Sequence, residues 1–332
     1  MIITRTPFRI SFFGGGTDYP VWYKKNGGAV LSTSIDKYCY ITCRQLPPFF
    51  KYKYKIVYSK LEEATSREKI DHPSARECLG HVSPNMNVVV AYDADVPARS
   101  GLGSSSSFTV GLLNALYGLS GHKKTKTQLA LEALHVEQNL IKENVGSQDQ
   151  VVAAFGGFNK INFEVSGKFR VIPLVINQER LDSLQKHLMM FFTGFSRTAS
   201  KIAAEQIRLT PQKSNELNVM KQMVNEAADI LRSKKRNLDD FGKLLHESWQ
   251  LKRSLSPQIS NSAIDKIYDI GRQAGALGGK LLGAGGGGFI LFFARPEDQP
   301  RIKEKLKKYL HVPFKFENTG SQIIYHSSQD KY

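Results

Sequence analysis

The chain has 332 residues, of which 41% are apolar and 23% charged, and 46 basic against 30 acidic side chains give a formal net charge of +16. This is the composition of a globular protein with one large or two ordinary domains. Three cysteines are too few for a disulfide framework, the N-terminus lacks the apolar core of a signal peptide, and the longest uncharged stretch is too short to span a membrane. We therefore expect a soluble, cytoplasmic protein and exclude the secreted, disulfide-rich, membrane-spanning and fibrous classes.

A strand and a glycine-rich turn are predicted near the N-terminus. Ile10 and Phe12 alternate with polar residues as in a half-buried strand, and residues 14–18 read Gly-Gly-Gly-Thr-Asp shortly after them. Asp18 has two open interpretations, because an aspartate here is either an ordinary turn former or a carboxylate that grips substrate hydroxyls.

Aromatic residues alternate with lysines in residues 49–55. Such a surface could stack the bases and contact the phosphates of a nucleic acid. A strand with its lysines toward water explains the same alternation, and at a sheet edge the lysines would discourage pairing with another chain. Because no recognisable nucleic-acid-binding module accompanies the segment, we predict a strand here and no nucleic-acid partner.

A second glycine-rich segment, residues 97–107, lies between a strand predicted at 87–92 and a helix predicted at 108–119. Glycines let the backbone approach a ligand, and the free N–H groups and dipole of a helix start favour an anion. We interpret the segment as a phosphate cradle, with a serine-capped flexible connection as the alternative. It is neither a Walker A loop nor a nucleophile elbow, since G-x-x-x-x-G-K-[ST] and G-x-S-x-G are both absent from the chain.

Two acidic residues, Glu137 and Asp149, follow the cradle. The helix predicted over 129–141 places Glu137 on its apolar face, and Asp149 comes just after this helix. A carboxylate on an apolar face is costly unless it is paired or binds a cation. Two interpretations stay equally open: a metal-bound glutamate with a catalytic aspartate, or a buried Glu–Arg pair with an aspartate in a loop.

The second half is predicted to be rich in helices. An apolar run at 188–192 is followed by helical patterns at 200–209, 216–232 and 238–251, and a strand-like run ends this part at 289–293. We place a domain boundary near residue 185, which gives domains 1–185 and 186–332.

The third glycine-rich segment runs from Gly275 to Gly288, where eight of fourteen residues are glycine. Residues 283–288 satisfy G-x-G-x-x-G, but a dinucleotide fold needs a helix after this motif, and here a strand follows. A glycine loop that packs backbone to backbone, over a ligand held by the first half, fits better.

Taken in order, the three segments resemble the signature motifs of the GHMP kinases (galacto-, homoserine, mevalonate and phosphomevalonate kinases). The motifs are P-x-R…G-G-x-T-D from Pro7, P-x-x-x-G-L-G-S-S-S from Pro97 and K-x-x-G-A-G-G-G-G from Lys280. The resemblance implies an α+β, two-domain architecture with an N-terminal ribosomal-protein-S5-domain-2-like α/β domain that binds ATP and a C-terminal ferredoxin-like α+β domain. Within the family the chain is similar to D-glycero-D-manno-heptose 7-phosphate kinases, in FRISFFGGGTDYP (8–20), ENVGSQDQ (143–150) and FTGFSRTASKIAAEQI (192–207).

The resemblance also implies roles for residues at the phosphate end. Asp149 would orient or deprotonate the attacking hydroxyl, and Arg9 would lower the pKa of that hydroxyl and neutralise developing charge. Ser105 and Glu137 would be the protein ligands of Mg²⁺. The residues that would wrap the ATP phosphates are Gly101, Leu102, Gly103, Ser104, Ser105 and Ser106.

The acceptor would meet the first and third segments. Its hydroxyls would be bound by Gly15, Gly16, Thr17 and Asp18, while Gly285 and Gly286 would close the site from the second domain. If the acceptor carries a phosphate of its own, Arg197 is the candidate to hold it, with Lys280 a weaker one. An anionic acceptor also accounts for the positive net charge.

The implied reaction is ATP- and Mg²⁺-dependent phosphorylation of the anomeric hydroxyl of D-glycero-D-manno-heptose 7-phosphate, which gives the 1,7-bisphosphate. Galactokinases have Glu-His in place of Gly15-Gly16, and fucokinases carry a tryptophan in place of Gly16, so the glycines suggest room for a larger sugar. The alternatives are a kinase for an unphosphorylated, fucose- or galactose-like sugar and a non-catalytic protein that binds nucleotide or sugar. We expect ATP and a sugar phosphate as partners, no nucleic acid and no membrane, and leave monomer and homodimer open.

Overall fold

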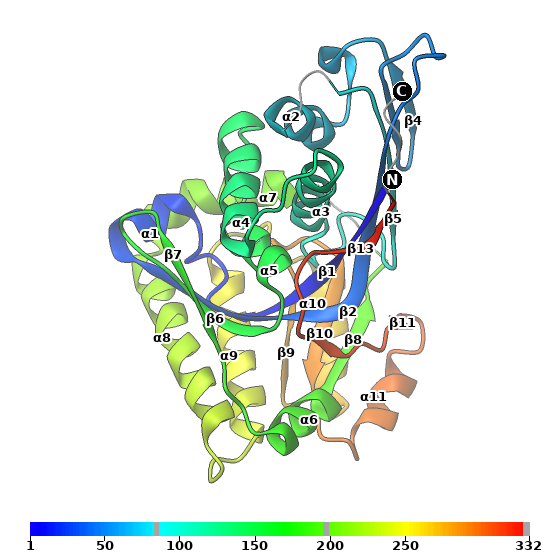
Figure 1. Cartoon of the computed structure of the whole chain (residues 1–332). Helices are drawn as coiled ribbons and strands as arrows, with labels where there is room; N and C mark the ends of the chain where they lie inside the picture. Colours follow the sequence, from blue (N-terminus) through cyan, green and yellow to red (C-terminus); the bar gives the residue numbers. More distant parts are fainter. Residues whose placement is uncertain (83–85, 195–198, 328–332) are drawn as a thin grey trace.

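The computed structural model describes residues 1–82, 86–194 and 199–327, which form two β-sheets with helices packed against them (Figure 1). The first sheet has the strand order β13-β1-β2-β5-β3-β4, with β6 and β12 also paired to β2 and β7 paired to β6. Its strands are β1 (Ile2–Phe13), β2 (Gly28–Gln45), β3 (Tyr54–Val57), β4 (Leu61–Ala64), β5 (Val88–Ala94), β6 (Phe158–Phe163), β7 (Phe169–Pro173), β12 (Phe316–Glu317) and β13 (Gln322–His326).

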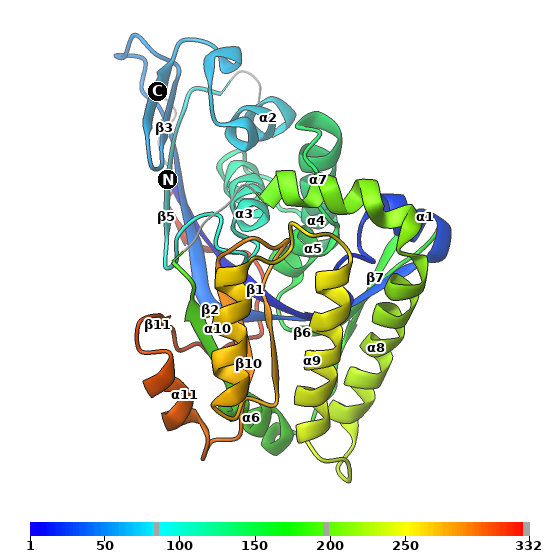
Figure 2. The same ribbon diagram turned by 180° about the vertical axis from the view of Figure 1, so that it is seen from behind.

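The second sheet has the order β11-β8-β10-β9. Its strands are β8 (Leu188–Phe192), β9 (Gly278–Leu281), β10 (Phe289–Phe293) and β11 (Leu310–His311). Figure 2 shows α8, α9 and α10 side by side next to this sheet.

The helices of the first part are α1 (Pro20–Asn26), η1 (Arg67–Lys69), α2 (Pro73–Val82), α3 (Ser104–Leu119), α4 (Lys126–Leu134), η2 (His135–Leu140), α5 (Gln148–Phe155) and α6 (Gln178–His187). Those that follow are α7 (Ala199–Leu209), η3 (Thr210–Gln212), α8 (Ser214–Arg232), α9 (Asp239–Ser254), α10 (Ser262–Gln273) and α11 (Gln299–Lys305). Within the described residues, none of these helices combines the length and the apolar character that crossing a membrane requires.

Strand β1 connects the two parts of the molecule and leads into the first glycine-rich segment. It pairs with β2 from Ile2 to Phe13 and contacts α3 and α5 as well as α8 and α9. Residues 6–13 are therefore buried without interruption, as is typical of a strand covered on both faces. Arg9 lies on this buried stretch, so the strand holds a cation inside the protein.

The α+β class and most predicted elements are confirmed. The strands predicted near Ile10 and at 87–92, 188–192 and 289–293 are β1, β5, β8 and β10, and the helices predicted in the second half are α7, α8 and α9. The helix predicted at 108–119 is α3, which begins four residues earlier, at Ser104.

The strand predicted over residues 49–55 is wrong for most of its length. β3 begins only at Tyr54, residues 49–51 form a turn and bends, and β3 lies between β5 and β4 instead of at the edge. Phe50 and Tyr52 stack on each other with ring centroids 5.3 Å apart. Their spacing of two thus reflects a local aromatic pair and not a pleated strand.

The boundary predicted near residue 185 falls within α6, just before β8, the first strand of the second sheet. The end of the chain then returns to the first sheet, where β12 pairs with β2 and β13 pairs with β1. Segment 186–332, predicted as one domain, therefore contributes strands to both sheets. A local pattern predicts a short strand but not the sheet that it joins.

Candidate active site

The predicted phosphate cradle lies at the N-terminus of α3. Gly101 and Gly103 have φ angles of +82° and +78°, a left-handed backbone that favours glycine. Ser107 N donates to Gly103 O at 2.9 Å, so the N–H groups of residues 104–106 precede the first hydrogen bond of the helix. No acidic residue lies in the first turn. The helix start therefore offers free donors and partial positive charge to an anion.

The C-terminal glycine loop packs against this cradle backbone to backbone, which confirms the packing expected for the third segment. Phe289 N donates to Ser100 O at 3.1 Å. A Cβ at Gly288 would lie 2.1 Å from Ser100 O, and a Cβ at Gly101 would lie 2.4 Å from Leu282 O. Glycines are thus required on both sides of this contact. Two segments far apart in the sequence form one wall of the site.

Gly285 and Gly286 lie against a different neighbour. Gly286 N donates to Ile259 O at 2.9 Å, and a Cβ at Gly285 would lie 2.7 Å from Ile259 Cα. Both glycines thus tie the loop to the segment between α9 and α10.

Arg9 and Asp149 form a bidentate ion pair beside the cradle. Arg9 Nε and Nη2 donate to the two carboxylate oxygens of Asp149 at 2.9 and 2.8 Å, and Nη1 donates to Gly101 O at 2.6 Å. The Arg9 side chain is 5% exposed and that of Asp149 is 25% exposed. Asp149 Oδ2 lies 3.4 Å from the point that a Cβ would occupy at Gly103. A partly open carboxylate is therefore held in a fixed orientation at the start of α3.

Glu137 is fully buried and points toward the same helix start. Its Oε2 accepts hydrogen bonds from Ser106 Oγ, at 2.9 Å, and from Gln150 Nε2. Its Oε1 has no partner among the described residues. Burial raises the pKa of Glu137 to about 7, although the polar side chains of Thr109, Gln150 and Ser106 act in the opposite direction. Since its described partners are neutral, the alternative of a buried Glu–Arg pair is wrong.

Ser105 and Ser106 differ in burial. Ser105, the predicted metal ligand, is exposed, whereas Ser106 is 3% exposed and bonded to Glu137. Both residues belong to the first turn of α3, where one step along the chain turns a side chain by about 100°.

A widened helical turn carries Glu137. The helix predicted over 129–141 is α4 followed by the π-helical turn η2, in which Ile141 N donates to Val136 O, five residues back, at 2.9 Å. The wider turn shifts later residues around the axis, and Leu140 is 39% exposed although a regular helix would place it three residues after the buried Glu137 on the same face. Such π-turns are frequent at functional sites.

Asp18 is buried at the other end of the site. Its Oδ1 accepts from Gly16 N at 2.8 Å and its Oδ2 accepts from Gln148 N at 3.4 Å. Burial is the main cause that raises the pKa of Asp18, and the charge of Asp149 adds to the shift. Asp18 therefore closes the glycine turn, and its carboxylate lies within electrostatic reach of Asp149.

Thr17 and Gly15 have opposite surroundings. The Thr17 hydroxyl contacts Gly14 O and Ala29 O at 2.8 Å each and accepts from Ala29 N, so the fold occupies it, and its predicted substrate contact finds no support here. A Cβ at Gly15, in contrast, would meet only ordinary contacts, at 3.7 Å or more.

Gln206 and Lys252, two buried residues of the second half, also lie at this end of the site, and they were not predicted from the sequence. Lys252 Nζ donates to Gln206 Oε1 at 2.7 Å and to Gly15 O at 3.3 Å. Helical spacing contains the signal for Lys252, which follows Trp249 by three residues and Leu245 by seven, both buried on α9. A lysine on an apolar helix face is costly to bury, so its ammonium group is expected to bind specific polar partners.

Of the two basic residues considered for an acceptor phosphate, Lys280 is buried. Its Nζ donates to Ser11 O and Phe12 O at 2.8 and 3.0 Å, and burial lowers its pKa to about 7. Arg197 lies outside the described residues.

Among the described residues, no group of three or more His, Cys, Asp or Glu side chains could hold a metal ion without other ligands. Glu137 Oε1, buried and without a partner, nevertheless fits a hard divalent cation. The remaining ligands of such a cation would then come from serine hydroxyls, water and the nucleotide phosphates.

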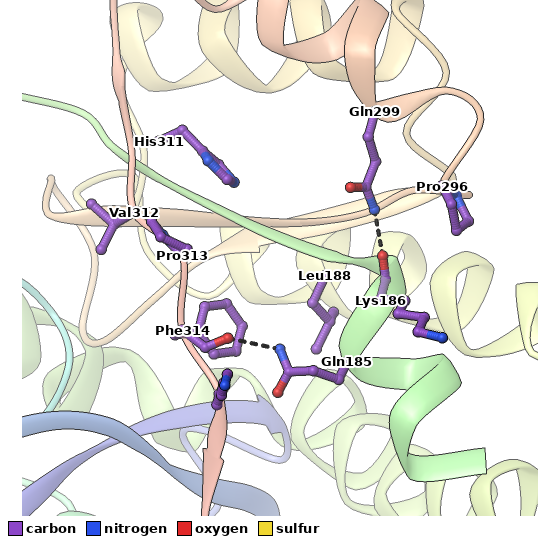
Figure 3. Close-up of a pocket in the computed structure, with 10 residues that line it drawn as sticks. Gln185, Lys186, Leu188, Pro296, Gln299, His311, Val312, Pro313 and Phe314 are labelled. Carbon is purple, nitrogen blue, oxygen red and sulfur yellow. Dashed lines mark hydrogen bonds between the residues drawn. The ribbon is translucent and has the colours of Figure 1, made fainter. Parts of the chain in front are cut away.

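A pocket of about 440 Å³ lies elsewhere, between the end of α6 and the segment that contains β11 (Figure 3). Side-chain amides of its lining bond to the backbone: Gln185 donates to Phe314 O and Gln299 donates to Lys186 O. None of the predicted site residues lines this pocket.

Comparison with known proteins gives matches in both halves of the chain. The family model "GHMP kinases N terminal domain" matches residues 70–157 and "GHMP kinases C terminal" matches residues 227–312. D-glycero-alpha-D-manno-heptose 7-phosphate kinase of Campylobacter jejuni is 29% identical, over 92% of this chain and 93% of that protein. A bifunctional fucokinase/GDP-fucose pyrophosphorylase of Arabidopsis thaliana is 26% identical over 94% of this chain but 32% of its own length.

The fold has a solved counterpart. The crystal structure of a D-glycero-D-manno-heptose 1-phosphate kinase from Bacteroides thetaiotaomicron superimposes with a TM-score of 0.81 and 22% identity, covering 99% of this chain and all of that one. Both family models match in order, and the phosphate cradle and the clamped Asp149 lie within the N-terminal match. This chain belongs to the GHMP kinases, which transfer a phosphoryl group from ATP to an alcohol.

Proposed function

We propose that this chain is a sugar kinase that phosphorylates the anomeric hydroxyl of D-glycero-D-manno-heptose 7-phosphate and so forms the 1,7-bisphosphate. The observation that carries the proposal is the position of Asp149, whose carboxylate is clamped by Arg9 next to the start of α3. A nucleotide phosphate at the helix start and an acceptor hydroxyl would meet there. Similarity to the Campylobacter jejuni enzyme over nearly the whole of both chains supports the choice of acceptor.

The nucleotide phosphates bind at the cradle. The N–H groups of residues 104–106 and the positive end of the α3 dipole face the anion. Gly101 and Gly103 keep side chains away from it, and the loop from Gly283 to Gly288 closes one side of the cradle. Phosphoryl transfer depends mainly on positioning and charge stabilisation, so a rigid cradle supplies most of what the reaction needs.

Asp149 orients the attacking hydroxyl and accepts its proton. Arg9 fixes both oxygens of this carboxylate and places a positive charge where negative charge develops. Glu137, with Ser105 or Ser106, would hold Mg²⁺, which would supply positive charge to offset that of the nucleotide phosphates.

The acceptor lies at the glycine turn, over Gly15 and Gly16, with Asp18 near its hydroxyls. Gly15 leaves space where a galactokinase-like side chain would stand, whereas a Cβ at Gly16 would lie only 2.7 Å from Gln206 Nε2. Arg197 holds the phosphate that the acceptor already carries, because a guanidinium suits bidentate contact with phosphate. An Arg197→Ala variant is expected to have a higher KM for heptose 7-phosphate and an unchanged KM for ATP.

The test measures ADP release with Mg-ATP across heptose 7-phosphate, mannose 6-phosphate, free heptose, galactose, fucose and mannose. Turnover with heptose 7-phosphate alone supports the proposal. Turnover with a free sugar keeps the role of Asp149 but removes the acceptor and Arg197 assignments. No turnover with any sugar, while ATP still binds, would favour the non-catalytic alternative.

A further inference from the structure

Buried polar atoms without partners surround Gly15 and Gly16. Ser11 Oγ, Gln148 Oε1 and Gln206 Nε2 make no hydrogen bond within the described parts of the chain. A Cβ at Gly15 would lie 3.8 Å from Ser11 Oγ and 3.7 Å from the Gln148 amide nitrogen. A Cβ at Gly16 would lie 2.7 Å from Gln206 Nε2. Buried polar atoms are normally hydrogen-bonded, so a cluster of unpaired ones indicates a ligand that completes it.

Gln206 reaches this cluster from α7, in the second half of the chain. Its side chain is 1% exposed, and its Oε1 accepts a hydrogen bond from Lys252 Nζ at 2.7 Å. An ammonium group can only donate hydrogen bonds, so the amide oxygen must face Lys252 and the amide nitrogen must face away from it. The hydrogen bond from Lys252 therefore orients the Gln206 amide so that it presents a donor, and not an acceptor, beside Gly16.

Lys252 is itself held by the fold. It lies on the buried face of α9, which packs alongside α8 (Figure 2), and its Nζ also donates to Gly15 O at 3.3 Å. Burial lowers its pKa to about 8, and the negative charge of Asp18 opposes this shift. A buried ammonium costs free energy. Nothing in the proposed phosphoryl transfer uses this one.

We infer that Gln206 is a specificity-determining residue, whose Nε2–H donates to one hydroxyl oxygen of the acceptor beside Gly16. Lys252 is the positioning residue that keeps this donor pointed at the acceptor. The inference rests on the proposed function in one respect, that the acceptor is a polyhydroxylated sugar. It assigns the second half of the chain a direct part in choosing the acceptor, since a sugar without oxygen at this position would leave Gln206 unpaired.

The test compares kcat/KM for the preferred sugar of the panel, heptose 7-phosphate first, with its monodeoxy and deoxyfluoro analogues. Fluorine can accept a weak hydrogen bond but cannot donate one, and hydrogen can do neither. In the unaltered protein, one deoxy position is expected to cost roughly 10- to 100-fold, and the fluoro analogue at that position should lose less. In Gln206→Leu the deoxy penalty at this position should vanish, with KM for ATP within about twofold.

Lys252→Met tests the positioning role. Without the ammonium the amide can rotate, so the fluoro and deoxy analogues at that position should become equally poor acceptors. A merely structural role for Lys252 would lower stability but leave the fluoro–deoxy difference intact. Gln185→Leu is the matched control, because the Gln185 amide bonds to Phe314 and Phe316 outside the site. It should leave the whole analogue series unchanged.

Each outcome bears on the inference. Equal deoxy penalties in the unaltered protein and in Gln206→Leu would overturn it. A fluoro analogue as poor as the deoxy one in the unaltered protein would overturn the orientation by Lys252. If Gln206→Leu does not fold, Gln206→Glu keeps the contact with Lys252 but offers an acceptor oxygen, and should reject the fluoro analogue most strongly. If the unaltered protein turns over no sugar, the proposed function falls as well; if it is active without this coupling, only the inference falls.

Discussion

The two ends of the active site differ in how their polar groups are satisfied. At the phosphate end, Arg9 and Asp149 bind each other through both carboxylate oxygens. At the acceptor end, Ser11, Gln148 and Gln206 each keep a buried polar atom without a partner among the described residues. The fold alone orients the Arg9–Asp149 pair, whereas the polar atoms around the glycine turn, like Glu137 Oε1 beside the cradle, need a ligand to complete them. Changes to the Arg9–Asp149 pair should therefore affect kcat, and changes at the glycine turn should affect KM for the acceptor.

Asp149→Asn gives the largest expected effect. The amide can keep the size of the side chain but cannot take a proton, so kcat should fall about 10²- to 10⁴-fold with the KM values little changed. Steady-state ADP release checks this, and a melting temperature like that of the unaltered protein shows that the fold is retained. Turnover close to that of the unaltered protein would remove Asp149 from the proton transfer.

Glu137→Gln should change how stability depends on pH. The pKa of Glu137 is raised from 4.5 to about 7, so between these pH values the folded chain holds a proton that the unfolded chain has released. The free energy of unfolding of the metal-free protein should therefore fall as pH rises through this window, by on the order of 3 kcal/mol from this group. Glutamine has no proton to lose, so the variant should lack this part of the decline.

Urea unfolding at pH 5, 6 and 7 measures the difference between the two proteins. If the free energy of unfolding changed with pH in the same way for both proteins, the buried environment described for Glu137 would be contradicted. Loss of Mg²⁺-dependent activity in the same variant would sharpen the comparison, because it would link the unpaired Oε1 of Glu137 to the metal.

Gly101→Ala should disturb the contact between the two glycine loops. The new Cβ would lie 2.4 Å from Leu282 O, on a backbone with φ of +82°. We expect a loss of about 1–3 kcal/mol in unfolding free energy and a raised KM for ATP. Gly121→Ala is a matched control, since Gly121 has φ of +75° but open space around its Cβ position. Equal KM values for ATP in both variants would show that the loop contact does not shape the cradle.

Gly15→Ala should give the smallest effect and the cleanest separation of the two ends. Its Cβ would meet side chains only at 3.7 Å or more, so stability should change by less than about 0.5 kcal/mol. The methyl group would occupy space meant for the acceptor, and KM for the acceptor should rise about 3- to 10-fold while KM for ATP stays constant. A rise in KM for ATP instead would place Gly15 at the phosphate end of the site and not at the acceptor end.

Local sequence patterns determined much of the secondary structure of this protein and some of its buried positions. Alternation predicted β1, helical spacing predicted α3, α8 and α9, and the same spacing placed Glu137 on a buried face. These features follow from the backbone periods of 2 and 3.6 residues and from the cost of exposing apolar side chains, which act within a short segment. The glycine loops were also readable, because only a close backbone approach explains so many glycines together.

Only the tertiary structure determined which residues far apart in the chain contact each other. It paired Arg9 with Asp149, gave Glu137 the hydroxyl of Ser106, and brought Gln206 and Lys252 to the glycine turn. It also returned β12 and β13 to the first sheet. These contacts join residues far apart in the chain, and their partners are selected by three-dimensional packing and by the need to pair buried polar groups, neither of which leaves a periodic trace in the sequence.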